Sequence, residues 1–189
     1  MSKRYEMRFA GSGGQGVILA SVILAEAAVI AGLNTVQSQA YGPEARGGVS
    51  KAETVLSRDA IWYSKVTCPN FLLALTQASL DAYTKVLAED AVVMYDDSLE
   101  PPALPEGARL IAAPILRTAK EKVGKAFTAN IVAVGAINAA LGLFDEETLM
   151  EAVRRHIPAG TEEINRKALA AGGELISPEQ AAAFAQRID

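Results

Sequence analysis

The chain has 189 residues and half of them are hydrophobic, which is enough apolar material for one domain with a buried core. Its net charge of −4, from 18 basic and 22 acidic residues, disfavours nucleic acid as a partner, because proteins that bind DNA or RNA usually carry a basic excess. The single cysteine, Cys68, cannot supply the ligands of an iron–sulfur cluster, and the single histidine, His156, leaves little for a metal site or a histidine-based triad.

The longest apolar stretch, residues 17–33, carries Glu26 near its middle. A bilayer span needs about 20 mainly apolar residues, and a glutamate within it is costly. The first residues lead into glycines and show no cleavage-site pattern. We therefore expect a buried helix here, no membrane as a partner, and a cytoplasmic protein.

The first 39 residues predict a strand over 5–10, a glycine-rich turn, a helix over 17–31 and a second strand over 35–39. The helix is apolar on nearly every face, so we expect it to be packed on both sides. This order of elements predicts a βαβ unit, and hence a parallel sheet.

Further strands are expected at 49–57, 71–75, 91–95 and 109–113, with a helix over 77–87. The last third of the chain predicts helices over 126–141, 145–156 and 161–171. A final helix is expected after Ser177, where proline and a capping-box glutamine follow. The predicted fold class is α/β, a Rossmann-like and mostly parallel sheet flanked by helices, with a helical C-terminal end.

The first motif consists of Gly11, Gly13 and Gly16, which match G-x-G-x-x-G between a strand and a helix. Free amides at the start of that helix could hold a phosphate. A NAD site also needs an acid about 20 residues later, yet residues 35–39 read Thr-Val-Gln-Ser-Gln. Three interpretations stand: a nucleotide site, a purely structural turn, and contact with a bound group or a partner subunit, which we favour.

The second motif, residues 38–48, follows the second strand at the edge where open α/β sheets bind ligands. Large polar residues, Tyr41, Glu44 and Arg46, occur there among glycines and a proline. The Arg46 guanidinium could pair with a carboxylate or phosphate through two hydrogen bonds, or it could pair with Glu44 and hold the loop.

Together these motifs resemble the gamma subunit of 2-oxoacid:ferredoxin oxidoreductases. The resemblance rests on Gly-Ser-Gly-Gly-Gln-Gly-Val at 11–17, Ser-Gln-Ala-Tyr-Gly-Pro-Glu-Ala-Arg-Gly-Gly at 38–48 and Ser-Lys-Ala-Glu at 50–53. Pro-Asn-Phe-Leu-Leu-Ala-Leu at 69–75 and Phe-Thr-Ala-Asn at 127–130 also fit. It extends to about Gly172, so we expect a gamma-type domain over 1–172 and a helical extension over 173–189.

The resemblance implies a complex with alpha, beta and possibly delta subunits. That complex converts a 2-oxoacid, coenzyme A and oxidised ferredoxin into acyl-CoA, carbon dioxide and reduced ferredoxin. Thiamine diphosphate, Mg²⁺ and iron–sulfur clusters are expected on the other subunits, since this chain also lacks the Gly-Asp-Gly of thiamine diphosphate sites. No catalytic residue and no metal ligand is expected here, and the chain alone should be inactive.

The residues expected to contact a cofactor or coenzyme A lie in the two glycine-rich loops. They are Gly11, Gly13, Gly14, Gln15, Gly16, Tyr41, Gly42, Pro43, Glu44, Arg46, Gly47 and Gly48. Within the family, the second motif looks closest to the 2-oxoglutarate type. The alternatives within the family are the pyruvate, branched-chain and indolepyruvate types. Outside the family, the alternative functions are a stand-alone NAD(P)-binding enzyme and a pure interaction module.

Overall fold

A six-stranded sheet runs through residues 4–40 and 49–185, the part of the chain that the computed structural model describes. The strands lie side by side in the order β2-β3-β1-β4-β5-β6. The pairs β1–β4, β4–β5 and β5–β6 are parallel, whereas β3 is antiparallel to both of its neighbours, β1 and β2. Five strands therefore point the same way, and the prediction of a mostly parallel sheet is confirmed. The strands are β1 (Tyr5–Ser12), β2 (Asn34–Ala40), β3 (Val49–Ser57), β4 (Phe71–Ala74), β5 (Val92–Asp96) and β6 (Arg109–Ala113).

The expected β–α–β order is present, since β1 and β2 run parallel with α1 between them in the chain. The two strands are not neighbours, because β3 lies between them and pairs with both. Burial explains this order. Residues 52–57 of β3 are buried on both faces, whereas the side chains of β2 are exposed or half-buried. The more polar strand therefore takes the edge and the more buried strand the interior.

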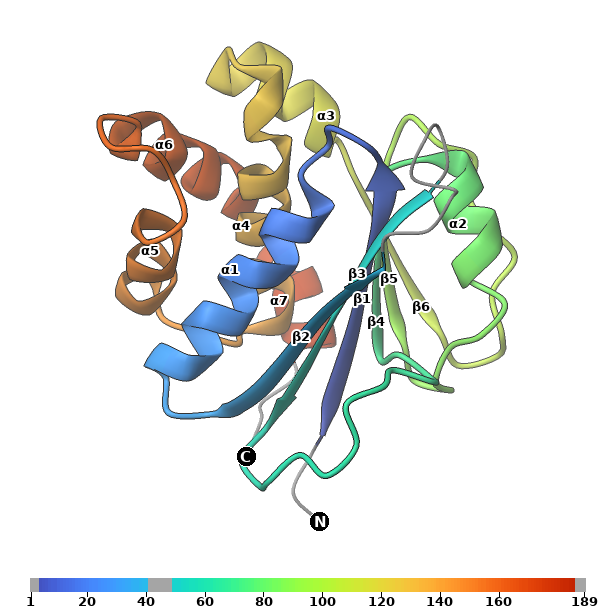
Figure 1. The fold of residues 1–189 in the computed structure, drawn as a ribbon. Coiled ribbons are helices and arrows are strands. Elements are labelled where there is room, and N and C mark those ends of the chain that lie inside the picture. Colours follow the sequence, from blue (N-terminus) through green and yellow to red (C-terminus); the bar gives the residue numbers. More distant parts are fainter. Residues whose placement is uncertain (1–3, 41–48, 186–189) are drawn as a thin grey trace.

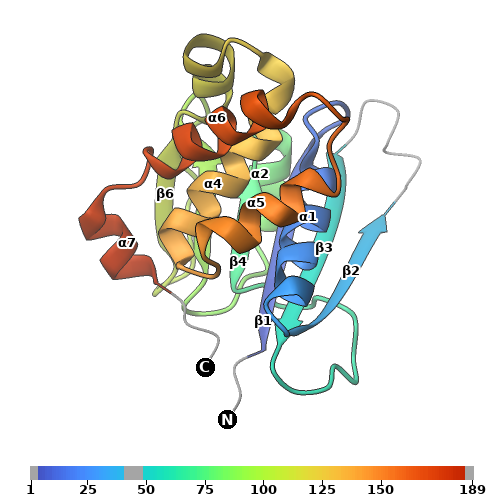
Figure 2. The same cartoon turned by 90° about the vertical axis from the view of Figure 1, so that its left-hand side faces the viewer.

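Helices cover the two faces unequally (Figure 1). The helices α1, α4, α5, α6 and α7 lie on one side of the sheet, and α2 lies on the other, as Figure 2 also shows from the side. Their bounds are α1 (Val17–Ile30), α2 (Gln77–Tyr83), α3 (Ile115–Arg117), α4 (Ala129–Leu141), α5 (Glu146–Arg154), α6 (Glu162–Gly173) and α7 (Pro178–Phe184). A π-helical turn, η2 (Thr118–Val123), continues α3, and a 3₁₀ turn, η3 (Ala126–Thr128), leads into α4.

The apolar helix α1 is packed on both sides, as predicted. It contacts β1, β2 and β3 on one side and α4 and α5 on the other. Ser21 of α1 makes polar contacts with two strands: its hydroxyl lies 3.0 Å from the Thr54 hydroxyl of β3, both fully buried, and accepts a hydrogen bond from Gln37 Nε2 of β2 at 3.2 Å. Outside this layer, the backbones of α4 and α6 are in contact at Gly135 and Gly172. This approach is possible because glycine has no Cβ atom, for which there would be no room at either position.

The helical C-terminal end is present, and its caps follow the sequence signals. The side chains of Asp145 and Ser177 accept hydrogen bonds from the amides of Thr148 and Gln180. Thr161 is the N-cap residue of α6, but its side chain does not cap. The helical segment 115–123 was not expected from the sequence. Within the described ranges, no helix combines the length and the apolar character needed to cross a membrane.

Candidate functional site at the glycine loop

The glycine loop, residues 12–16, follows β1 at the carboxyl edge of the parallel strands. Sheet register brings the strand ends that flank residues 41–48 to the same edge. Ser12 at the end of β1 pairs with Val49 at the start of β3, and Ala40 at the end of β2 pairs with Lys51. The strand ends on either side of 41–48 thus meet the glycine loop. The predicted site residues Tyr41, Gly42, Pro43, Glu44, Arg46, Gly47 and Gly48 lie outside the described residues.

Gln15 bridges β1 and β4 at this edge. Its Oε1 accepts a hydrogen bond from the Ser12 amide at 2.7 Å, and its Nε2 donates to the Leu75 carbonyl at 3.1 Å. A Cβ at Gly11 would lie 2.6 Å from Gln15 Oε1, so glycine there leaves space for the bridge. The helices that follow β1 and β4 lie on opposite faces of the sheet, which makes this the switch point where open α/β sheets bind ligands (Figure 1). Here the Gln15 side chain occupies the position between the strand ends.

The open side of the loop faces β3 instead. A pocket of about 250 Å³ lies there. Its lining comes from the loop, the first turn of α1 and the start of β3, namely Ser12, Gly13, Gly14, Gly16, Val17, Ile18 and Ser50. Gly13 and Gly14 are exposed, and within the described part of the chain no atom beyond their immediate neighbours lies within 4 Å of where their Cβ atoms would be. On the side of Gly13 and Gly14, the pocket is therefore lined by backbone atoms without side chains.

The start of α1 gives this pocket a positive character. Gly16 is the N-cap residue, with φ of 72°, and no side chain caps the helix. The first intrahelical bond runs from the Ala20 amide to the Gly16 carbonyl, so the amides of residues 17–19 have no partner within the helix. The first turn carries no acid. Such an end attracts a phosphate or carboxylate.

Sequence reasoning missed Asn130 as a residue of this site. Asn130 lies in the first turn of α4, is 5% exposed, and packs against Gly16. A Cβ at position 16 would come within 2.8 Å of its Nδ2 atom. The segment 127–130 supported the family resemblance, but nothing in it indicated that the asparagine fixes the loop from another helix.

Of the predicted residues that the structure describes, Gly13, Gly14 and Gly16 line the pocket, whereas Gly11 and Gln15 lie behind it. Among residues 4–40 and 49–185, no three side chains of His, Cys, Asp or Glu come close enough to hold a metal ion.

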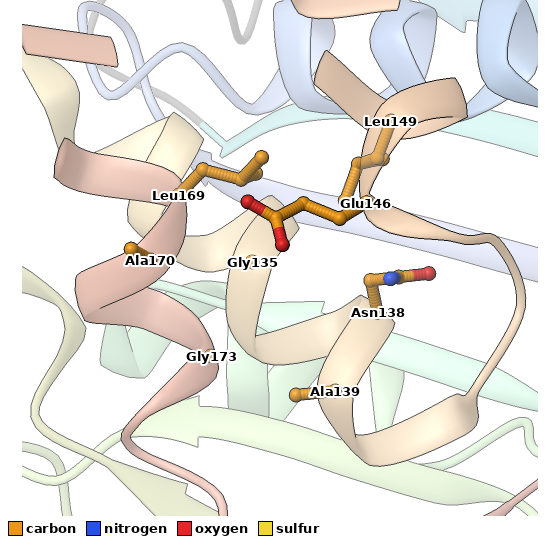
Figure 3. A pocket seen from close by; sticks show the side chains of 8 residues that line it. All are labelled: Gly135, Asn138, Ala139, Glu146, Leu149, Leu169, Ala170 and Gly173. Atoms are coloured by element: carbon orange, nitrogen blue, oxygen red, sulfur yellow. The ribbon is translucent and has the colours of Figure 1, made fainter. Parts of the chain in front are cut away.

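A second pocket, of about 210 Å³, lies between α4, α5 and α6 (Figure 3). Figure 3 shows the Glu146 side chain extending from the start of α5 toward α6, above Gly135. The remaining lining is small or aliphatic apart from Asn138, and both polar ends of the Asn138 amide bond the backbone of Phe144. None of the predicted site residues that the structure describes lines this pocket, so the glycine loop remains the candidate site.

Known proteins resemble this chain in sequence along most of its length. The family model for pyruvate ferredoxin/flavodoxin oxidoreductase matches residues 6–175. The 2-oxoglutarate synthase subunit KorC of Methanothermobacter marburgensis is 41% identical, over 94% of this chain and 99% of its own length. The ketoisovalerate oxidoreductase subunit VorA of Methanothermobacter thermautotrophicus is 38% identical over 89% of this chain, which corresponds to only 35% of VorA.

A solved structure shares the fold. The keto/oxoacid ferredoxin oxidoreductase gamma subunit of Geobacter sulfurreducens superposes with a TM-score of 0.79 at 43% identity, covering 95% of this chain and 99% of that one. The resemblance derived from the two glycine motifs is thereby confirmed. The chain belongs to the pyruvate ferredoxin/flavodoxin oxidoreductase family.

Proposed function

We propose that this chain is the gamma-type subunit of a 2-oxoglutarate:ferredoxin oxidoreductase. The complex would convert 2-oxoglutarate, coenzyme A and oxidised ferredoxin into succinyl-CoA, carbon dioxide and reduced ferredoxin. The observation that carries the proposal is the 41% identity to KorC along nearly the whole of both chains. Because the two chains match end to end, the likeness is between whole subunits and does not rest on one shared segment.

Thiamine diphosphate, Mg²⁺ and iron–sulfur clusters are assigned to the alpha and beta subunits, and to delta where present. An iron–sulfur cluster does not fit the residues of this chain, since one exposed cysteine cannot ligate it. Ferredoxin meets the complex through those other subunits, and the complex is expected in the cytoplasm. This chain's contribution is a shaped, polar surface beside the reacting groups.

The glycine pocket is the surface that we assign to coenzyme A. Its phosphates are anions, and the pocket offers the uncapped amides at the start of α1 beside the bare backbone of Gly13 and Gly14. Gly11, Gln15 and Gly16 hold the loop in place from behind. In the second motif, Arg46 is proposed to pair with a phosphate or with the 2-oxoacid carboxylate. Tyr41, Gly42, Pro43, Glu44, Gly47 and Gly48 are proposed to complete the same contact surface.

A stand-alone NAD enzyme is the weaker alternative. The strand that would carry the ribose-binding acid, β2, is separated from β1 by β3 and carries glutamine and serine at its end. Gln15 also occupies the switch point between β1 and β4. Both features depart from the arrangement that binds dinucleotides in Rossmann folds.

The test is reconstitution. The alpha and beta subunits of the same source would be assembled anaerobically with and without this chain, and 2-oxoglutarate-dependent reduction of ferredoxin would be followed at saturating coenzyme A. The proposal predicts turnover only when this chain is present. It fails if the chain does not associate with those subunits, or if the isolated chain binds NAD(H) stoichiometrically.

A further inference from the structure

Trp62, the only tryptophan in the chain, is 94% exposed, and its neighbour Tyr63 is 55% exposed. Both lie in residues 58–70, which join β3 to β4 without helix or strand. Connections of this length without secondary structure are uncommon and are usually functional. Figures 1 and 2 show this segment looping outward at the end of the sheet where β1 begins.

Arg4 fixes the backbone of this segment next to the exposed rings. Its guanidinium donates to the Tyr63 carbonyl at 2.5 Å and to the Lys65 carbonyl at 3.2 Å. Its Nε also donates to Glu6 at 2.7 Å, and that pair keeps the guanidinium in position. The carbonyls on either side of Ser64 are thus held by one cation.

Two further charged residues of β1 continue the attachment. Glu6 accepts a hydrogen bond from the Thr67 amide at 3.3 Å, and Arg8 donates to the Val66 carbonyl at 3.1 Å. Arg8 is buried and paired with buried Glu53 at 2.8 Å. Residues 4, 6 and 8 alternate along the chain, so they project from the same face of the sheet. The side chains of Arg4, Glu6 and Arg8 therefore hold the segment that carries Trp62 at four of its carbonyl or amide groups.

Buried ion pairs such as Arg8–Glu53 are poor stabilisers of a fold, because desolvation offsets their attraction. Here the arginine also orders the loop. A tryptophan presented on an ordered loop loses little conformational freedom when another surface covers it, and tryptophan and tyrosine are enriched among the residues that dominate protein interfaces. We infer that Trp62 and Tyr63 form a docking surface for another subunit of the oxidoreductase.

Chain length indicates which partner this is. KorC is a separate subunit of nearly the length of this chain, whereas in VorA the matching segment makes up 35% of a longer polypeptide. The remaining part of VorA is thus joined covalently to a copy of this fold. Where this fold is a separate subunit, as in KorC, the subunit that corresponds to the rest of VorA must bind it through noncovalent contacts. That subunit is the occupant we assign to Trp62 and Tyr63, an inference that rests on the proposed function.

The docking surface and the glycine pocket lie at opposite ends of β1. The eight residues Tyr5–Ser12 separate them by about 25 Å at the usual rise per strand residue. Substitution of Trp62 should therefore change assembly without altering the pocket, which makes the two roles separable by experiment.

The single tryptophan allows a direct test. The full chain would be labelled with 5-fluorotryptophan, which gives one ¹⁹F resonance, and titrated with the unlabelled alpha and beta subunits. In the free chain the resonance should show the full shift between H₂O and D₂O that an exposed indole gives, and in the complex this solvent shift should disappear. A complex that forms while the solvent shift persists overturns the inference.

Variants provide the second arm. Trp62→Ala should weaken association about 30-fold or more, the effect of truncating a dominant interface residue. Val29→Ala changes an apolar α1 residue that is 54% exposed and serves as the matched control. Its dissociation constant for the other subunits should stay within about twofold of the unsubstituted chain's. Unchanged association of Trp62→Ala refutes the docking role. If the free chain alone loses the solvent shift on concentration, the occupant is a second copy and our assignment is wrong. Failure of any complex to form instead contradicts the proposed function.

Discussion

Asn130, in the first turn of α4, lies so close to Gly16 that a Cβ at position 16 would come within 2.8–2.9 Å of its Nδ2, Cβ and Cγ atoms. Gly16 has φ of 72° and is the N-cap residue of α1. Residues at the starts of two helices that are far apart in the sequence thus define the shape of the glycine loop. This contact explains why the third glycine of the motif is needed even without a bound dinucleotide.

The three loop glycines should therefore tolerate alanine in a fixed order. Gly13→Ala meets open space without a positive φ, so the free energy of unfolding should change by less than about 1 kcal/mol. Gly14→Ala, at φ of 90° in open space, should cost about 1–2 kcal/mol. Gly16→Ala adds the clash with Asn130 and should cost about 2–4 kcal/mol.

Urea unfolding of the three variants checks this order. The double variant Gly16→Ala with Asn130→Gly should recover the part of the loss that comes from the clash, and not the part that comes from backbone strain. An equal loss at positions 14 and 16 would show that Asn130 does not confine the loop.

Much of the fold followed from the sequence because its signals are local. The strand at 5–10, the all-apolar helix and the capping box at Ser177 each depend on neighbouring residues, and each was confirmed. Strand order did not follow. The place of β3 between β1 and β2 depends on how fully each strand is buried, which periodicity alone does not give. The contact between Asn130 and Gly16 is equally non-local.

Gln15 should prove to be a structural residue. Gln15→Ala leaves the Ser12 amide and the Leu75 carbonyl without their partner and should lower the free energy of unfolding by about 1–3 kcal/mol. Gln39→Ala, at an exposed glutamine of β2, is the matched control and should change it by less than about 0.5 kcal/mol. Thermal or urea denaturation measures both. If the two variants are equally stable, Gln15 has no structural role and is again a candidate for contact with a ligand.

Arg46 is predicted to act in the assembled enzyme. Arg46→Ala should leave this chain folded, because the polar, glycine-rich sequence around it predicts a surface position, where one arginine adds little stability. Loss of one charge-assisted hydrogen bond, about 1.5–3 kcal/mol, should lower kcat/KM for coenzyme A or for the 2-oxoacid roughly tenfold to a hundredfold. Steady-state kinetics on reconstituted complexes, with assembly checked by gel filtration, decides this. Unchanged constants in an intact complex would show that Arg46 only holds its loop.

The part of the predicted extension that follows Ile176 should be dispensable for folding. No residue of α7 is buried, and its attachments include a hydrogen bond from Arg109 to the Ala183 carbonyl and the stacking of Arg109 over Phe184. A chain that ends after Ile176 should unfold cooperatively, with a loss of about 1–3 kcal/mol. Arg109→Ala in the full chain should reproduce much of that loss. Failure of the shortened chain to fold would make α7 part of the domain.

The central claim is tested most directly by the substrate preference of the complex that contains this chain. The complex would be purified anaerobically through a tag on this chain, and kcat/KM for 2-oxoglutarate, pyruvate, 2-oxoisovalerate and indolepyruvate would be measured from ferredoxin reduction with coenzyme A present. Our account predicts that 2-oxoglutarate gives the highest value and that omission of coenzyme A stops steady turnover. A higher kcat/KM for one of the other three 2-oxoacids, or purification of this chain without any thiamine diphosphate-containing partner, would contradict it.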